Sequence, residues 1–257
     1  MSIPKNEIAI QEFTSLIEKM RKINLHEIDS RILPKSFKPT KVFSLILERI
    51  SYARKIKAPL MIIAGANGAG KSSAARYFAN SEGVPMGEVV SGTQPKHLLS
   101  NICKQLAIDP GAGWMMQVET LTRQLKDAPR TIIFDEAQRL NYESFDLLKY
   151  LADNSGGTFV LIGSASMISR IERWPDIDSR CPVKVRVEAM DLTEFSNLYQ
   201  MDGYSDKALA EIHAQTKGVM RNIHYLLAHI EEALQESKIT KSQITSAHIQ
   251  RLAEQVF

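Results

Sequence analysis

One short segment combines glycines, a lysine and a hydroxyl in a pattern that suits phosphate binding. Residues 65–72 read Gly-Ala-Asn-Gly-Ala-Gly-Lys-Ser, a full match to the phosphate loop GxxxxGK[ST]. Glycines permit a tight turn and a close backbone approach, so that main-chain N–H groups can converge on phosphate oxygens. In this motif Lys71 reaches the β- and γ-phosphates, and the hydroxyl of Ser72 ligates Mg²⁺. The alternative is a glycine-rich turn that ends in Lys-Ser by chance.

The segments on either side of this loop support the phosphate-binding interpretation. Residues 60–64 form a short apolar run that predicts a buried strand, and residues 73–79 carry alanines and aromatics at helical spacing. A loop between a strand and a helix N-terminus is where phosphate binds best. We therefore expect ATP and Mg²⁺ as cofactors. The residues expected to contact the nucleotide are Gly65, Ala66, Asn67, Gly68, Ala69, Gly70, Lys71, Ser72 and Ser73.

Two adjacent carboxylates follow another apolar run. Residues 131–134 read Thr-Ile-Ile-Phe, and Asp135 and Glu136 come next, as in a Walker B strand. Asp135 would hold Mg²⁺, mostly through water, because Mg²⁺ dehydrates reluctantly. Glu136 would act as the general base toward the attacking water, which favours hydrolysis over the action of a small-molecule kinase. The alternative is that both carboxylates cap the following helix.

Three more polar residues are candidates for the same site. Ser164 ends the apolar run 159–163 and could touch the γ-phosphate, although a plain loop serine fits equally. Arg180 precedes the last expected strand and could act as an arginine finger on a neighbouring subunit. Arg221 begins a later helix and could reach the phosphates of its own subunit. Each arginine could also be an ordinary surface residue.

The whole-chain composition is that of an ordinary globular protein. Of 257 residues, 44% are hydrophobic and 24% charged, and the net charge of +3 permits nucleic-acid binding without demanding it. Cys103 and Cys181 are too few for a disulfide framework, which favours a reducing compartment. The sequence shows neither a leader nor a run approaching about 18 apolar residues. We expect a cytoplasmic protein with no membrane partner.

Strand and helix patterns alternate up to about residue 190 and give way to helices alone after it. This order predicts an α/β fold with a central parallel sheet flanked by helices, followed by a small all-helical C-terminal lid. The expected parts are an N-terminal helical extension over 1–57, a phosphate-loop core over 58–190 and the lid over 191–257. The extension, with amphipathic patterns over 5–24 and 40–56, could be a docking arm or simply a packed segment.

The expected elements can be given by residue range. After the phosphate-loop helix, the expected strands are 87–90, 130–134, 158–163 and 183–188. The expected helices are 95–106, 114–126, 143–153, 165–173, 191–200, 205–216, 219–236 and 245–256.

Several motifs together resemble the AAA+ ATPases, and within them the DNA transposition proteins of the MuB, TnsC, TniB and IstB type. The resemblance extends over about residues 40–236. Its carriers are the phosphate loop, Phe-Asp-Glu-Ala-Gln-Arg-Leu at 134–140, Leu-Ile-Gly-Ser at 161–164, Asp-Ser-Arg at 178–180 and Gly-Val-Met-Arg at 218–221. The last three resemble the sensor 1, arginine-finger and sensor 2 segments, although family members often have Asn or Thr where this chain has Ser164.

The resemblance implies an ATPase that assembles on duplex DNA, as a ring or helical filament, without strong sequence preference. Such proteins recruit or activate a transposase, so a transposase and a target-selector protein become expected partners. Lys96 at a helix N-terminus, and Lys104 further along, are the expected DNA contacts; the alternative for both is a solvated lysine. Two other functions remain open: a DNA-linked AAA+ helicase loader or initiator, and an ExeA-like secretion-accessory ATPase.

Overall fold

The structure is a computed structural model that describes residues 38–109, 111–236 and 239–257. The chain divides into two compact units, Met1–Lys38 and Pro39–Phe257, and the second unit contains almost all described residues. The helix expected over 5–24 lies outside the described residues. Within the part that the structure describes, no helix has the length and apolar character needed to span a membrane.

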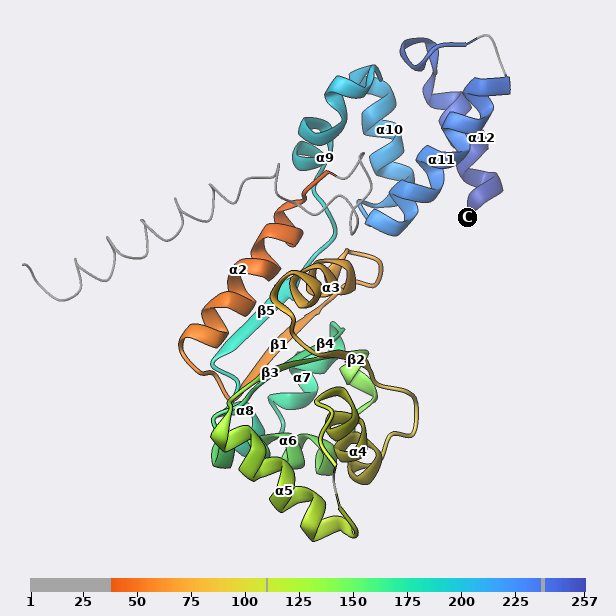
Figure 1. The fold of residues 1–257 in the computed structure, drawn as a ribbon. Helices are drawn as coiled ribbons and strands as arrows, with labels where there is room; N and C mark the ends of the chain where they lie inside the picture. The colour runs from red at the N-terminus through yellow and green to blue at the C-terminus, as the bar shows by residue number, and fades with distance from the viewer. Residues whose placement is uncertain (1–37, 110, 237–238) are drawn as a thin grey trace, which may run out of the picture. The chain divides into compact units, whose positions relative to one another are not determined.

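A five-stranded parallel sheet forms the centre of the second unit (Figure 1). Its strand order is β2-β3-β4-β1-β5, so β1 and β4 are central neighbours. The strands are β1 (Leu60–Gly65), β2 (Met86–Glu88), β3 (Thr131–Asp135), β4 (Thr158–Ser164) and β5 (Val183–Val187). The side chains of β1 are buried along its whole length, as expected where helices cover both faces of a parallel sheet. The predicted α/β class is confirmed.

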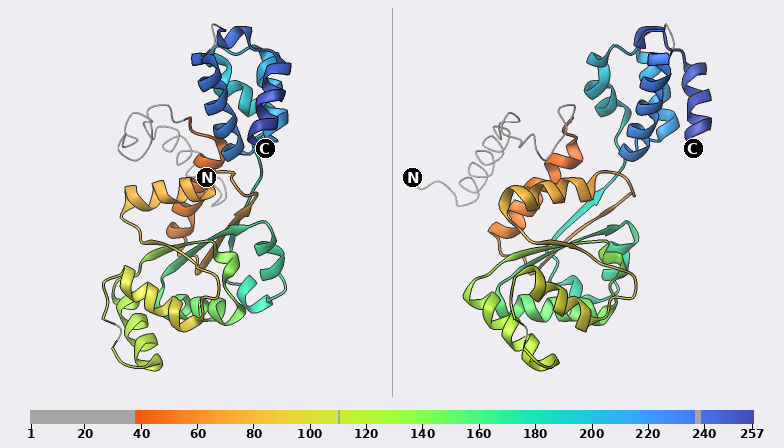
Figure 2. Two further views of the ribbon diagram at one scale, coloured as in Figure 1. Left: turned by 90° about the vertical axis from the view of Figure 1, so that its right-hand side faces the viewer. Right: turned by 45° about the vertical axis from the view of Figure 1, so that its right-hand side comes forward.

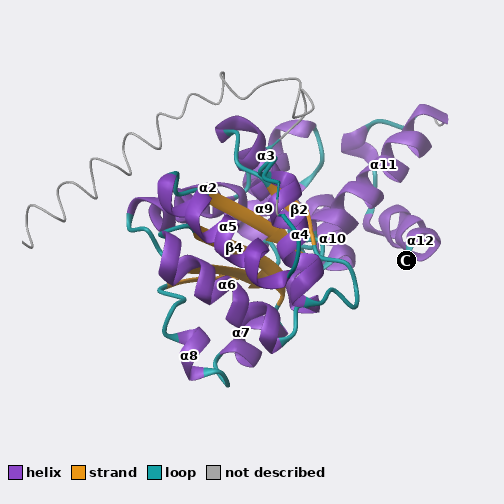
Figure 3. Ribbon diagram, turned by 60° about the horizontal axis from the view of Figure 1, so that its bottom comes forward, coloured by secondary structure: helices purple, strands orange, loops and turns teal. Residues whose placement is uncertain are grey.

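Helices cover both faces of the sheet (Figures 2 and 3). The helices α2 and α3 lie on one face, and α4 to α8 lie on the other. Local signals fix several helix ends: the Thr40 hydroxyl accepts a hydrogen bond from the Phe43 N–H to cap α2, and Asn141 caps α6 in the same way. The helices are α2 (Lys41–Lys55), α3 (Lys71–Glu82), α4 (Pro95–Gln105), α5 (Trp114–Asp127), α6 (Tyr142–Ser155), α7 (Ser166–Ile171) and α8 (Pro175–Asp178).

The C-terminal part is helical, as the sequence predicted. Its helices are α9 (Leu192–Tyr199), α10 (Asp206–Thr216), α11 (Met220–Glu236) and α12 (Ser246–Val256). They share a hydrophobic core that includes Phe195, Ile212, Ile223 and Ile249, all fully buried. Burial of these side chains gives the C-terminal helices a packing centre of their own.

Several elements differ from their expected ranges by one or more residues, and two of these differences are described here. The second strand covers Met86–Glu88 rather than 87–90, because its ladder with β3 pairs Glu88 with Asp135, where β3 ends. The helix expected over 165–173 ends at Ile171, and the short helix α8 follows, which the periodicity did not indicate. Pro175 begins α8 as its first residue and disfavours helical geometry at Trp174, so α7 and α8 stay separate helices.

Candidate functional site

The carboxyl ends of three neighbouring strands bring the predicted site residues together. Gly65 ends β1 and lies opposite Ser164, the last residue of β4. Asp135 ends β3, the next strand along the sheet. The chain leaves β1 very close to β5: the Ala66 N–H donates to Val187 O at 3.1 Å, and a Cβ on Gly65 would lie 1.8 Å from that oxygen. Glycine at 65 is therefore a steric requirement at the start of the loop.

The phosphate loop leads directly into the first turn of α3. Gly70 precedes that helix with φ +93°, a conformation that glycine adopts without strain. No described side chain caps this helix N-terminus, so its main-chain N–H groups remain suited to an anion. Ser72 is half-buried and Ser73 exposed in the first turn. This geometry matches the strand–loop–helix arrangement that the sequence predicted.

Lys71 lies inside the loop with only 7% of its surface exposed. Its Nζ donates hydrogen bonds to the carbonyl oxygens of Gly65, at 3.0 Å, and Ala66, at 2.7 Å. Burial lowers the pKa of Lys71, and nearby Arg221 lowers it further, whereas the charges of Asp135 and Glu136 oppose that change. Lys71 therefore lies within electrostatic reach of both carboxylates and of Arg221, as a phosphate site with a catalytic carboxylate requires.

Asp135 and Glu136 take different positions at the end of β3. Asp135 is buried, at 8% exposed, and its Oδ1 accepts a hydrogen bond from the Glu136 N–H at 2.9 Å. Glu136 has φ +57°, which is uncommon for a residue with a side chain and is concentrated at functional sites. Its side chain is more than a third exposed. The buried carboxylate suits a metal ligand, and the accessible one suits a base.

Arg221 and Ser164 border the same loop. The Arg221 N–H donates to the Gly68 carbonyl at 3.1 Å, which holds the start of α11 against the phosphate loop. The Arg221 side chain is exposed. The Ser164 hydroxyl lies 3.0 Å from the Ser166 hydroxyl. Both residues thus lie beside the phosphate loop of their own chain, and their contact with phosphate stays a prediction.

Arg180 lies at the opposite end of the sheet. Its carbonyl accepts a hydrogen bond from the Leu60 N–H at the first residue of β1, whereas the phosphate loop follows the last residue. A strand of this length spans roughly 17 Å. The guanidinium contacts Asp153, with Nε 3.0 Å from Oδ1. Arg180 therefore does not join the site of its own chain.

The two lysines expected to contact DNA lie on the solvent-exposed side of α4. Lys96 is the second residue of that helix, follows Pro95 and is exposed. Lys104 is exposed in the last turn. No described side chain caps the N-terminus of α4, so Lys96 adds a charge to an end that already favours anions.

Two polar residues at the site were missed by the sequence reasoning. The Arg139 guanidinium forms an ion pair with Glu136, with Nη2 3.1 Å from Oε2, and also donates to the Val89 carbonyl at 2.8 Å. Gln138 donates to the same carboxylate oxygen at 2.8 Å. Both residues follow Glu136 within one turn. Their closeness to it in the sequence was the signal that could have indicated these contacts.

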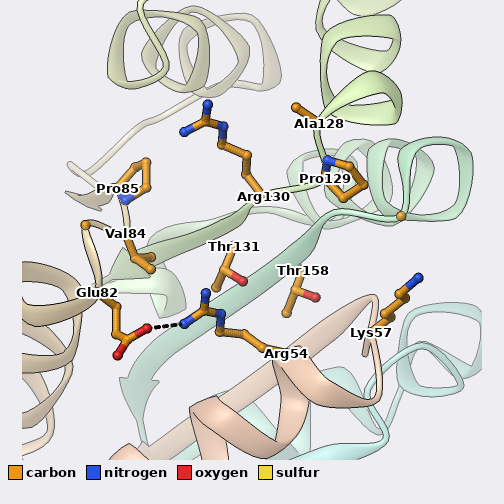
Figure 4. Close-up of a pocket in the computed structure, with 12 residues that line it drawn as sticks. Arg54, Lys57, Glu82, Val84, Pro85, Ala128, Pro129, Arg130, Thr131 and Thr158 are labelled. Carbon is orange, nitrogen blue, oxygen red and sulfur yellow. Dashed lines mark hydrogen bonds and ion pairs between the residues drawn. The ribbon is translucent and has the colours of Figure 1, made fainter.

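A pocket of about 500 Å³ lies at the amino-terminal end of the sheet, away from the phosphate loop (Figure 4). Arg54, Lys57 and Arg130 line it, and Arg54 forms an ion pair with Glu82 at 2.9 Å. Its walls include Gly83, Ala128 and Gly156, which directly follow α3, α5 and α6. Helix C-termini favour cations, so these ends account for the basic lining. None of the predicted site residues lines this pocket.

The two cysteines contribute no reactive thiol. Cys103 and Cys181 are both buried and free. Burial raises the pKa of Cys103, and it raises the pKa of Cys181 to about 12. A thiol attacks as the thiolate, so neither cysteine has the ionisation that a nucleophile needs at neutral pH.

Comparison with known proteins supports this description of the fold. A family model described as an AAA domain matches residues 55–171, which contain the phosphate loop, Asp135 and Glu136. A search of curated proteins finds no match.

Solved structures of archaeal proteins resemble the chain across most of its length. The Cdc6p structure from Pyrobaculum aerophilum has a TM-score of 0.67 and 16% identity, and the match covers 89% of this chain and 71% of that one. The Aeropyrum pernix ORC2 structure with ADPNP and ADP has a TM-score of 0.59 and 16% identity, with 89% and 72% covered. The A. pernix ORC1 structure in complex with DNA has a TM-score of 0.58 and 17% identity, with 88% and 69% covered.

At these identities the likeness defines the fold. The protein has the fold of the AAA+ phosphate-loop NTPases, as the sequence resemblance implied. None of the three structures described above is a transposition protein, so the narrower resemblance stays a prediction.

Proposed function

We propose that this protein is an ATPase that binds duplex DNA and forms oligomers on it. The ATPase activity is proposed because four charged residues converge at the phosphate loop: Lys71, Asp135, Glu136 and Arg221. Lys71 and Arg221 would neutralise the phosphates of ATP, and Glu136 would take the proton of the attacking water. The accessible position of the Glu136 carboxylate supports this role.

The residues at the loop fit Mg²⁺ as well as ATP. The Ser72 hydroxyl and the buried Asp135 carboxylate are the hard oxygen ligands that this ion prefers. Among the described residues, no group of three or more His, Cys, Asp or Glu side chains could hold a metal by itself. A Mg²⁺ site needs only one or two protein ligands, because phosphates and water supply the rest. When bound, the ion would neutralise charge that develops on the phosphates.

Arg180 is proposed to complete the site of a neighbouring subunit. Its distance from its own phosphate loop and its exposed guanidinium support action in trans. The sheet order adds support, because Arg180 precedes β5, an edge strand. Ring or filament assembly would then be required for full turnover.

We expect Arg180→Ala to lower turnover by roughly 10³-fold, as for other arginine fingers. Asp153→Asn is the matched control, because it breaks the same ion pair but retains the arginine. ATP turnover is measured across protein concentrations for both variants, and for mixtures of Arg180→Ala with Lys71→Ala. Each of these two is inactive alone, but interfaces that pair intact Lys71 with intact Arg180 should recover activity. Absence of recovery in demonstrated mixed oligomers would refute the assignment.

DNA binding is proposed to use the N-terminal end of α4. Phosphate contacts carry no base information, so affinity should vary little between unrelated duplexes and fall steeply with salt. Contacts repeated in every subunit would add up across an oligomer, so a modest net charge suffices.

Lys96→Ala should weaken binding similarly on all duplexes and flatten the salt dependence, with ATP binding unchanged. Lys207→Ala is a matched control, because Lys207 is also exposed and is the second residue of its helix, α10. Fluorescent duplexes of different sequence are titrated at several salt concentrations with ATP and with ADP. Equal slopes for the two variants would overturn the Lys96 assignment, and sequence-selective binding would overturn the proposed mode of binding.

The downstream role is proposed to be recruitment of a transposase, with a target-selector protein as a second partner. This proposal rests on the motifs that resemble MuB-like proteins, especially residues 134–140. A second candidate, an initiator or helicase loader, is favoured by the likeness to the ORC and Cdc6 structures. Reconstitution distinguishes the two, because stimulation of strand transfer by a transposase supports the first and loading of a helicase onto duplex DNA supports the second.

A further inference from the structure

Gln138 contacts two strand ends of the candidate site through one side chain. It lies in the short 3-10 turn Ala137–Arg139 that follows Glu136. Its Nε2 donates to Glu136 Oε2 at 2.8 Å. Its Oε1 accepts a hydrogen bond from the Ser164 N–H at 3.3 Å. The amide therefore links the carboxylate beyond β3 to the last residue of β4, which pairs with Gly65 at the start of the phosphate loop.

The surroundings of Gln138 hold it in this position. Its carbonyl accepts a hydrogen bond of 2.7 Å from Arg170 Nη1. That guanidinium lies over the rings of Phe145 and Trp174, at 5.6 and 5.4 Å from their centroids. The backbone of the turn is thus braced by a cation that itself packs on two aromatic rings.

The backbone of Gly163 leaves the space that the Gln138 amide occupies. A Cβ at Gly163 would lie 2.7 Å from Gln138 Oε1 and 3.2 Å from the Gln138 nitrogen. Any other residue at 163 would therefore displace the amide or the turn. The glycine at 163 therefore provides the space in which the Gln138 side chain lies.

The hydrogen bonds on Glu136 are unevenly divided between its two carboxylate oxygens. Gln138 and Arg139 both contact Oε2. Within the part of the chain that the structure describes, no hydrogen bond to Oε1 occurs. A carboxylate anchored through one oxygen presents the other in a fixed direction, which is the requirement for a general base toward a positioned water.

We propose that Gln138 is a positioning residue that orients Glu136 so that Oε1 faces the attacking water. This inference rests on the proposed ATPase function. Gln138 has no contact with the phosphates in this role and acts only through Glu136. Its loss should lower kcat and leave nucleotide affinity unchanged.

Two variants separate the hydrogen bond that Gln138 donates to Glu136 from the one that it accepts from the Ser164 N–H. Gln138→Met keeps the length of the side chain but removes both hydrogen bonds. Gln138→Glu keeps an acceptor for the Ser164 N–H but places a like charge beside Glu136. We expect both to lower kcat by about 10²-fold, with the KM and the affinity for an ATP analogue within twofold of wild type. Gln124→Met, at an exposed position of α5, is the matched control and should retain full turnover.

A double-substitution test distinguishes positioning from a general structural role. With Glu136→Gln already present, Gln138→Met should reduce the residual single-turnover rate by less than threefold, because the group it orients is gone. The inference would be overturned if the two substitutions lowered the rate multiplicatively, or if either Gln138 variant had a normal kcat. The ATPase proposal would stand in both cases. Absence of turnover in the wild-type protein would overturn both. Normal turnover in Glu136→Gln alone would overturn the inference and the assignment of Glu136 as the base, while the ATPase proposal stands.

Discussion

Glu136→Gln should bind ATP as tightly as the wild-type protein and hydrolyse it roughly 10³-fold more slowly. Loss of a general base typically lowers the rate of the chemical step by about 10²- to 10⁴-fold, and the expected effect lies within that range. Glutamine is nearly the same size and can still approach Gln138 and Arg139, so the shape of the turn should persist. The affinity should persist too, because Lys71, Ser72 and the loop backbone remain in place.

The measurement is a single-turnover assay alongside a titration with a fluorescent ATP analogue. Glu254→Gln, an exposed position on α12, is the matched control and should leave both quantities unchanged. Turnover in Glu136→Gln within a factor of three of wild type would show that another group serves as the base.

Lys71→Ala should remove nucleotide binding almost completely. Truncating one member of a buried, hydrogen-bonded charge pair costs about 2–5 kcal/mol, so we expect the Kd for ATP to rise by roughly 30- to 5,000-fold. The burial of Lys71 is the reason for this size of effect, because a solvated lysine would contribute far less.

Calorimetric titration with a non-hydrolysable ATP analogue measures the change directly. Lys126→Ala, at an exposed position on α5, controls for removal of a lysine elsewhere. The thermal unfolding of Lys71→Ala is compared with wild type, because the alanine also removes the hydrogen bonds to Gly65 and Ala66. A folded Lys71→Ala protein that retains wild-type affinity would contradict the assignment.

The features of the site that the sequence predicted are those that follow from neighbouring residues in the chain. An apolar run, a glycine-rich loop and a helix pattern together place Lys71 at a helix N-terminus, and the structure agrees. The carboxylates after residues 131–134 reach the same edge because parallel strands end together there. The sequence predicted that the strands would be parallel. It did not predict their order in the sheet, which the structure shows.

Contacts between distant segments could not be predicted from the sequence. The ion pair of Arg180 with Asp153 joins residues that are 27 positions apart, and no periodic pattern relates them. Gln138 reaches Ser164 over a similar separation. The Gln138 contact depends on β3 and β4 being neighbours and on the turn at Glu136, whose φ of +57° has no glycine to signal it.

Electron microscopy of the protein with ATP, with and without duplex DNA, tests the central claim most directly. We predict ordered rings or filaments on the duplex when ATP is present, and weaker assembly with Arg180→Ala, because the neighbour's arginine would contact the ATP bound at each interface. Glu136→Gln should retain the assemblies, since it binds ATP without hydrolysing it. Dispersed single subunits with both ATP and DNA present, or identical assemblies with ADP, would contradict the account.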